Sequence, residues 1–360
     1  MSKKKYSKSK YKANQKATMD ELFNKIKEGI KEIFQSDKWK NHLETISKFH
    51  NYSQRNILLI EMQNPNAKLV AGYKKWQTEF DRQVKKGEKA IKILMPIQIK
   101  KDIIERDDKG NPIVDEEGKL KKSTNKFLAF KYTNVFDISQ TKGKELDLFK
   151  LDELESTVQN KDVILKSIKE IADENNCIFR FDKVDDAKGY YSITENEIVI
   201  KKGMSDLQTL KTAVHELAHS MIHNPNSEYS AEVDGSRSKI SQKEIEAESI
   251  AYVVLHKLGL DTSDYSFGYI ASWGKNKTED ELSNILNNIK DISSLILNKI
   301  DNNIEVQKNI NLKLSNHVNK VTSRYPDKLK LDDIMDISKN THLRDSNNRN
   351  IKSRKNQLEL

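Results

Sequence analysis

The stretch Thr212–Asn224 reads TAVHELAHSMIHN and contains the pattern HELAH at residues 215–219. On a helix, residues four apart lie on one face, so His215 and His219 can direct both imidazoles at one cation. Glu216 follows the first histidine and can take a proton from a water molecule at that cation. Apolar residues occupy most other positions, which predicts a buried helix carrying a metal site.

A catalytic zinc site needs a third protein ligand and keeps a fourth position open. Three glutamates downstream compete for this role: Glu244, Glu246 and Glu248. Ser241 and Glu244 have the spacing of a capping box, which predicts that a helix starts at Ser241 and gives Glu244 a structural role. Glu248 lies on nearly the same side as Glu244, whereas Glu246 projects roughly opposite both. We favour Glu246 as the third ligand, with Glu244 as the alternative.

Other polar residues near this pattern have weaker assignments. His223 follows His219 by four residues, but a further helical turn drifts by ~40° and rises by ~6 Å. We therefore expect His223 to bind a backbone carbonyl or the substrate. Three tyrosines could donate a hydrogen bond to an oxyanion opposite the metal, with plain packing as the alternative: Tyr229, Tyr265 and Tyr269.

The chain of 360 residues has room for two domains, and its charge is uneven. Residues 1–150 contain 34 Lys and Arg against 20 Asp and Glu, whereas residues 151–305 contain 17 against 28. The final 55 residues are again basic, with 12 against 6. A basic part joined to an acidic part indicates two functions, of which the basic one could meet a polyanion. A solvated lysine-rich surface is the alternative.

Hydrophobic periodicity predicts the elements of both parts. The predicted helices are 19–34, 39–49, 53–63, 162–175, 205–223, 241–258 and 279–304. The predicted strands are 68–73, 90–99, 127–136, 177–184 and 190–200, with a charged hairpin at 107–118 and loops at 140–150 and 224–240.

Residues 68–100 hold nine Lys and Arg against three acids, with Tyr73, Trp76 and Phe80 between them. Cations that follow phosphates, beside aromatic faces on which bases stack, are typical of single-stranded nucleic-acid binding. The alternative is that Trp76 and Phe80 belong to the core. The candidate DNA-binding residues are Lys74, Lys75, Trp76, Arg82, Lys85, Lys86 and Lys89.

Two groups of motifs resemble known families. TAVHELAHSMIHN, followed by KEIEAESIAYVV at 243–254, resembles the ImmA/IrrE-type zincin peptidases, and LGLDTSDYSFGYIASW at 258–273 resembles the peptidase half of ArdC-like (LtrC-like) antirestriction proteins of mobile elements. YSQRN at 52–56, VAGYKKW at 70–76, VKKGEK at 84–89 and VFDISQT at 135–141 resemble the N-terminal domain of that family. One departure is FDRQ at 80–83, where the family has a Gly-Arg pair.

The resemblance implies a fold and a function. We expect an α+β protein with a disordered basic arm (1–16), a helical and β-sheet domain that binds single-stranded DNA (17–150), a zincin-like metallopeptidase domain (151–305) and a basic tail (306–360). It implies one Zn²⁺ per chain held by His215, His219 and Glu246, with Glu216 as the general base. It also implies an unidentified protein substrate and an antirestriction role.

Two other functions remain open. A DNA-binding protein with a structural or vestigial metal site would not need Glu216, and an ImmA-like regulatory peptidase would cleave a transcriptional repressor. No run of about 18 apolar residues predicts a membrane-spanning helix. The single cysteine, Cys177, and the lack of a predicted signal segment favour a cytoplasmic location.

Overall fold

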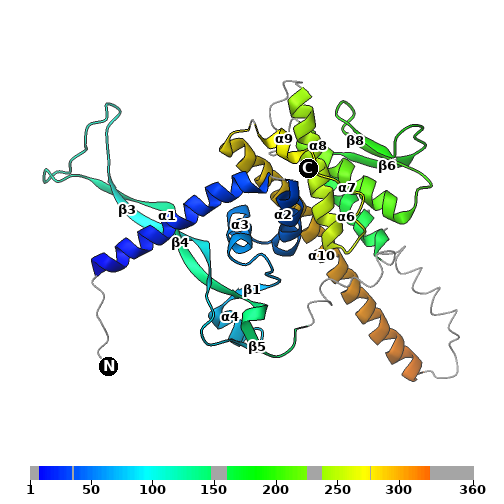
Figure 1. Cartoon of the computed structure of the whole chain (residues 1–360), viewed down its shortest axis with the longest axis horizontal. Coiled ribbons are helices and arrows are strands. Elements are labelled where there is room, and N and C mark those ends of the chain that lie inside the picture. The colour runs from blue at the N-terminus through cyan, green and yellow to red at the C-terminus, as the bar shows by residue number, and fades with distance from the viewer. Residues whose placement is uncertain (1–7, 35, 147–159, 225–236, 276, 325–360) are drawn as a thin grey trace. The chain divides into compact units, whose positions relative to one another are not determined.

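The computed structural model describes residues 8–34, 36–146, 160–224, 237–275 and 277–324. Within these residues, helices and three small sheets are mixed along the chain (Figure 1), so the predicted α+β class is confirmed. Residues up to Ile300 form one compact unit, and a second unit begins at Asp301. None of the described helices combines the length and apolar character that crossing a membrane requires.

The N-terminal helices follow the predicted apolar periodicity. They are α1 (Lys8–Ile33), α2 (Ser36–Phe49) and α3 (Gln54–Gln63). The prediction of a disordered arm is wrong for residues 8–16, because they are helical. Residues 1–7 lie outside the described part. Lysine, alanine and glutamine in this segment have good helix propensity, so they extend α1 before its apolar stripe begins.

Next come short strands and one long β-ribbon. The elements are β1 (Val70–Gly72), α4 (Tyr73–Thr78), β2 (Arg82–Val84), β3 (Ile91–Ile104), β4 (Lys122–Asp137), the short 3₁₀ helix η1 (Ile138–Gln140) and β5 (Thr141–Gly143). One sheet has the antiparallel order β1-β4-β3, and β2 pairs with β5. β3 and β4 stay in register from Ile91↔Val135 to Ile104↔Lys122, so both strands are longer than predicted.

Trp76 belongs to the core of this region. Its side chain on α4 is fully buried and packs with Ala71 and Val84. The indole Nε1 donates to the Phe136 carbonyl at 2.9 Å. The aromatic residue that the sequence offered as a stacking platform therefore holds α4 against the sheet instead.

The second part of the chain begins with α6 (Lys161–Glu174) and a small sheet. Its strands are β6 (Ile178–Asp182), β7 (Gly189–Ser192) and β8 (Glu197–Lys201). β8 is central, parallel to β6 and antiparallel to β7. The strand predicted over 190–200 is therefore a hairpin, turned at Asn196 with its positive φ of 46°.

Four helices complete the described part. They are α7 (Asp206–His223), α8 (Arg237–Lys257), α9 (Ile270–Gly274) and α10 (Glu279–Arg324). Ser241 and Glu244 lie inside α8, so the predicted capping box is wrong. The loop predicted over 224–240 is helical from Arg237, and residues 225–236 lie outside the described part.

The two predicted domains share a core. Trp39 of α2 is fully buried and its Nε1 donates to Ser249 Oγ of α8 at 3.2 Å. One turn further along α8, the Tyr252 hydroxyl donates to Glu44 at 3.2 Å. Both sides of the domain boundary predicted at residue 150 belong to one compact unit, and the division into two domains stays a prediction.

Replacing Trp76 should test its structural role. We expect Trp76→Ala to lower the free energy of unfolding by about 3–5 kcal/mol, because it leaves a large cavity and removes the hydrogen bond from the indole to the Phe136 carbonyl. Gln77→Ala, at an exposed neighbouring position of α4, should stay within about 0.5 kcal/mol. Urea unfolding followed by circular dichroism measures both, and equal stability of the two variants would contradict the assignment.

Candidate metal centre

Helix α7 is held in place by a cap at its N-terminus and by a close contact with strand β7. The Ser205 hydroxyl caps the helix by accepting from the Gln208 backbone N–H at 3.3 Å. Strand β7 lies close against α7 because Gly189 has no side chain: a Cβ there would come within 2.7 Å of Thr212 Cγ2 and 2.8 Å of the Val199 carbonyl. This contact brings the β7 backbone beside the HELAH turn.

Two histidines of α7 meet one glutamate of α8. His215 Nε2 lies 3.3 Å from Glu244 Oε1, and His219 Nε2 lies 3.3 Å from Glu244 Oε2. The two Nε2 atoms are 3.0 Å apart, with the imidazole rings at 86° to each other. One donor atom from each of the three residues therefore faces a common point.

The separations fit a small cation. A tetrahedral ion with ligand bonds of about 2.0–2.2 Å holds its ligand atoms about 3.3–3.6 Å apart. The separations of 3.0, 3.3 and 3.3 Å are close to that range. Two imidazoles and one carboxylate are also the donor set of many catalytic zinc sites. The residues present thus fit a zinc-like ion.

Glu246, the favoured third ligand in the sequence analysis, lies elsewhere. Its side chain is 1% exposed, and its carboxylate accepts from Gln242 at 2.9 Å and from Asn288 of α10 at 3.4 Å. Burial raises the pKa of this carboxyl to about 7. Two residues along a helix turn the side chain by about 200°, so Glu244 and Glu246 cannot face the same point. The structure brings the alternative, Glu244, to the histidines.

Glu216 lies beside the histidines in a buried position. Burial raises the pKa of its carboxyl, while His215 and His219 partly offset that rise. The Tyr191 backbone N–H of β7 also donates to the carboxylate. A buried carboxyl with a raised pKa and a fixed orientation suits a group that takes up and returns a proton.

The charges of the group depend on one another. The hydrogen bonds from His215 and His219 hold the pKa of the Glu244 carboxyl far below its usual range. Burial opposes the charged form of His215, but Glu244 and Glu216 outweigh it and raise the pKa of the imidazole. Without a cation, the carboxylates thus favour the protonated, positively charged form of the His215 imidazole. A bound metal ion would supply this positive charge instead.

The structure describes only some of the tyrosine and histidine candidates that the sequence analysis named near the metal centre. The Tyr269 hydroxyl donates to Glu248, one turn after Glu244, and the ring is 41% exposed. Tyr265 packs between Tyr252 and Phe267, as the packing alternative predicts. Tyr229 and the side chain of His223 lie outside the described part, so the other assignments stay predictions.

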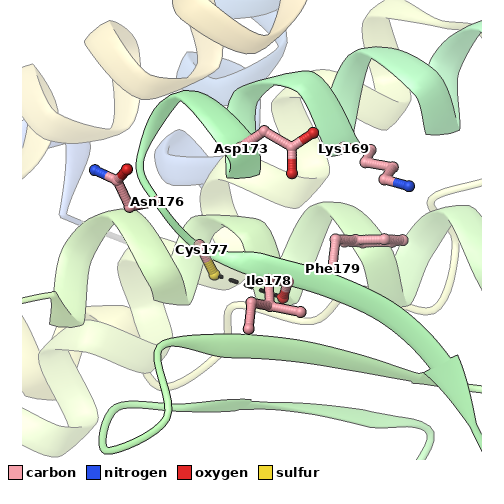
Figure 2. A pocket seen from close by; sticks show the side chains of 6 residues that line it. All are labelled: Lys169, Asp173, Asn176, Cys177, Ile178 and Phe179. Carbon is pink, nitrogen blue, oxygen red and sulfur yellow. Dashed lines mark hydrogen bonds between the residues drawn. The ribbon is translucent and has the colours of Figure 1, made fainter. Parts of the chain in front are cut away.

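A separate pocket lies where α6 meets β6 (Figure 2). Its lining residues are Lys169, Asp173, Asn176, Cys177, Ile178 and Phe179. Burial raises the pKa of the Cys177 thiol to about 11, so the thiolate that a nucleophile requires is scarce near neutral pH. Since His215, Glu216 and Glu244 are not among the lining residues, the pocket is distinct from the metal centre.

The seven candidate DNA-binding residues divide into four groups. Trp76 is in the core, as described above. Arg82 donates its Nε to Thr141 Oγ1 at 2.7 Å, and Lys85 donates to the Ser139 carbonyl at 2.8 Å, so both support the β2–β5 region. Lys75 pairs with Glu79 at 3.2 Å. The other three are exposed on this surface: Lys74, Lys86 and Lys89.

A comparison with protein families finds a match for the first part of the chain. Residues 12–136, about a third of the sequence, match the family model of the N-terminal domain of anti-restriction factor ArdC. This match agrees with the resemblance that the motifs of the N-terminal part predicted. The zincin resemblance of the second part stays a prediction.

Individual relatives extend over more of the chain. An uncharacterized protein of Bacillus anthracis, pXO2-81, is 28% identical over 335 residues, which cover 83% of this chain and 54% of that protein. The chain thus spans about half the length of this relative. The metal-free crystal structure of ArdC from the R388 plasmid is 17% identical, with a TM-score of 0.45, over 70% of this chain and 86% of that one. Its Mn(II)-bound structure gives a TM-score of 0.41 at the same identity, over 70% and 84%.

Metal analysis should identify the third ligand. We expect the wild-type chain to bind about one zinc ion, and Glu244→Gln and His219→Ala to lose it, because each removes one of three converging donors. Glu246→Gln should keep the metal, since its carboxylate faces Gln242 and Asn288. Mass spectrometry of dialysed protein measures zinc and manganese together. Loss of metal from Glu246→Gln with retention in Glu244→Gln would reverse the assignment.

Proposed function

We propose that this chain is a single-stranded-DNA-binding zinc metallopeptidase that acts in antirestriction. The observation that carries the peptidase half is the convergence of His215, His219 and Glu244 beside the buried Glu216. A site that bound metal for structure alone would need no proton acceptor next to its ligands. The antirestriction role is supported by the ArdC N-terminal domain at residues 12–136.

The chain's own residues can divide the work of peptide hydrolysis. A bound zinc ion would polarise the substrate carbonyl and lower the pKa of a water molecule. Glu216 would take one proton from the attacking water and deliver it to the amine nitrogen of the leaving segment as the C–N bond breaks. The Tyr191 backbone N–H keeps the Glu216 carboxylate oriented through this exchange. Water is consumed, and one new carboxyl end and one new amino end are formed.

The substitution Glu216→Gln isolates the proton transfer. We expect this variant to keep its fold and metal and to lose cleavage by a factor of at least 10², because only the proton acceptor is removed. Mass spectrometry of a peptide library incubated with each protein would score cleavage. Glu195→Gln, at an exposed position between β7 and β8, is the matched control and should cleave like the wild type.

Three outcomes would redirect the proposal. Equal cleavage by wild type and Glu216→Gln would show that another group is the base. A metal-loaded wild type that cleaves no peptide would favour the DNA-binding protein with a structural metal site. If cleavage occurs, capture of a transcriptional repressor by Glu216→Gln would favour the regulatory peptidase instead.

The DNA-binding half of the proposal is supported by charge and by exposure. Residues 1–150 carry a net charge of +14, from 34 basic and 20 acidic residues. Lys74, Lys86 and Lys89 are exposed, and among the described residues none of them has an acidic partner in an ion pair. Free lysines of this kind can neutralise phosphates without breaking contacts that hold the fold.

Salt dependence should measure these contacts in the full chain. We expect log affinity for a labelled single-stranded oligonucleotide to fall with log salt by about 0.7 per phosphate contact. The triple variant Lys74→Ala/Lys86→Ala/Lys89→Ala should flatten the slope by about 2 if each lysine contacts one phosphate. Fluorescence anisotropy at several salt concentrations gives both slopes. Binding by the wild type that does not change with salt would contradict an electrostatic interface.

A further inference from the structure

The outer half of the β3–β4 ribbon is a surface used neither by the metal centre nor by the lysines of α4 and the β2–β3 turn. In the described part of the chain, β1 pairs with β4 only at Val135–Asp137. The ribbon nevertheless continues in register out to Ile104↔Lys122 (Figure 1). An isolated two-stranded ribbon gains little stability in water by itself. A contact partner would explain its length.

One face of this ribbon combines lysines with apolar side chains. Lys100 is opposite Lys126, and Pro96 is opposite Phe130. Side chains alternate between the two faces of a strand, so positions an even number apart share one face. We call this the lysine face and define it by Lys100, Lys122, Lys126, Leu128 and Phe130. Asp102 lies on the same face, where its carboxylate accepts from the Thr124 hydroxyl at 2.8 Å. The opposite face carries Lys101, Lys131 and Phe127.

The lysine face contains an unfavourable pair of charges. Lys100 and Lys126 are direct cross-strand partners, and like charges at such positions destabilise a sheet. Both side chains are exposed, and no ion pair joins either of them to an acidic group within the described residues. A polyanion lying along this face would remove the repulsion, because its phosphates would lie next to both ammonium groups.

Apolar side chains continue the same face toward the body of the protein. Leu128 is 68% exposed and Phe130 is 40% exposed. Two residues further, the Tyr132 hydroxyl accepts from Gln15 of α1 at 3.2 Å, so α1 covers the inner end of the face. Lysines on the same face as an open aromatic ring fit a ligand that offers both phosphates and unstacked bases. Duplex DNA hides its base faces, and an acidic peptide offers charge without them.

We propose that the lysine face of the β3–β4 ribbon binds single-stranded DNA, with Lys100 and Lys126 on phosphates and Phe130 against a base. This inference rests on the proposed DNA-binding function. It adds a second contact surface to Lys74, Lys86 and Lys89. It also identifies an aromatic residue for stacking, because Trp76 is buried.

Matched variants on the two faces test the inference in the full chain. Lys100→Ala/Lys126→Ala should weaken binding of a labelled single strand and flatten the salt slope by about 1.4. Lys101→Ala/Lys131→Ala removes the same charge from the same strands on the opposite face and should keep the wild-type slope. Phe130→Ala should lose about ten-fold in affinity with an unchanged slope. Phe127→Ala, at 39% exposure on the opposite face, should bind like the wild type.

The outcomes separate this inference from the function on which it rests. If the wild type does not bind single strands, the proposed DNA-binding function fails and the inference fails with it. If the wild type binds but the two lysine pairs have equal effects, the assignment to this face is wrong. Equal competition by duplex DNA would overturn the base contact at Phe130. Circular dichroism and metal content that match the wild type confirm that each variant is folded.

Discussion

The packing of α7 against α8 is the contact on which the candidate centre depends. Two imidazoles separated by one turn of α7 need a carboxylate from outside that helix. The position of α8 allows Glu244 to supply it, with 3.3 Å to each histidine. Glu246, on the other side of α8, is bound by Gln242 and by Asn288 of α10. Glutamates two residues apart thus serve opposite surfaces of one helix, one toward the histidines and one toward the core.

The sequence was sufficient for the parts of this site that lie within one helix. The spacing in HELAH places His215 and His219 on one face wherever α7 lies, so no tertiary information is needed. The third ligand depends on the rotation of α8 about its own axis, which the sequence leaves open. The apparent capping box at Ser241 favoured Glu246 over Glu244, the glutamate that the structure brings to the histidines. It assigned Glu244 to a helix start, whereas α8 is already helical from Arg237.

The DNA-binding residues show the same limit in another form. Local composition found a segment rich in lysine and aromatic residues, but composition does not say which side chains the core requires. Trp76 fills the space between α4 and the sheet, and its N–H needs the Phe136 carbonyl. The face carrying Phe130 becomes visible only from the register of β3 with β4, since neither strand alone shows that Lys100 and Lys126 are opposite each other.

The contacts between α2 and α8 have a consequence for how such proteins can diversify. Trp39 and Glu44 come from the part of the chain before residue 150, and Ser249 and Tyr252 come from the helix that carries Glu244. A fragment starting at residue 151 would leave the Trp39 site on α8 empty and open to water. Recombination between relatives at that point would join an α2 surface and an α8 surface that are not complementary. The two halves are therefore expected to be inherited together, with compensating changes across the α2–α8 contact.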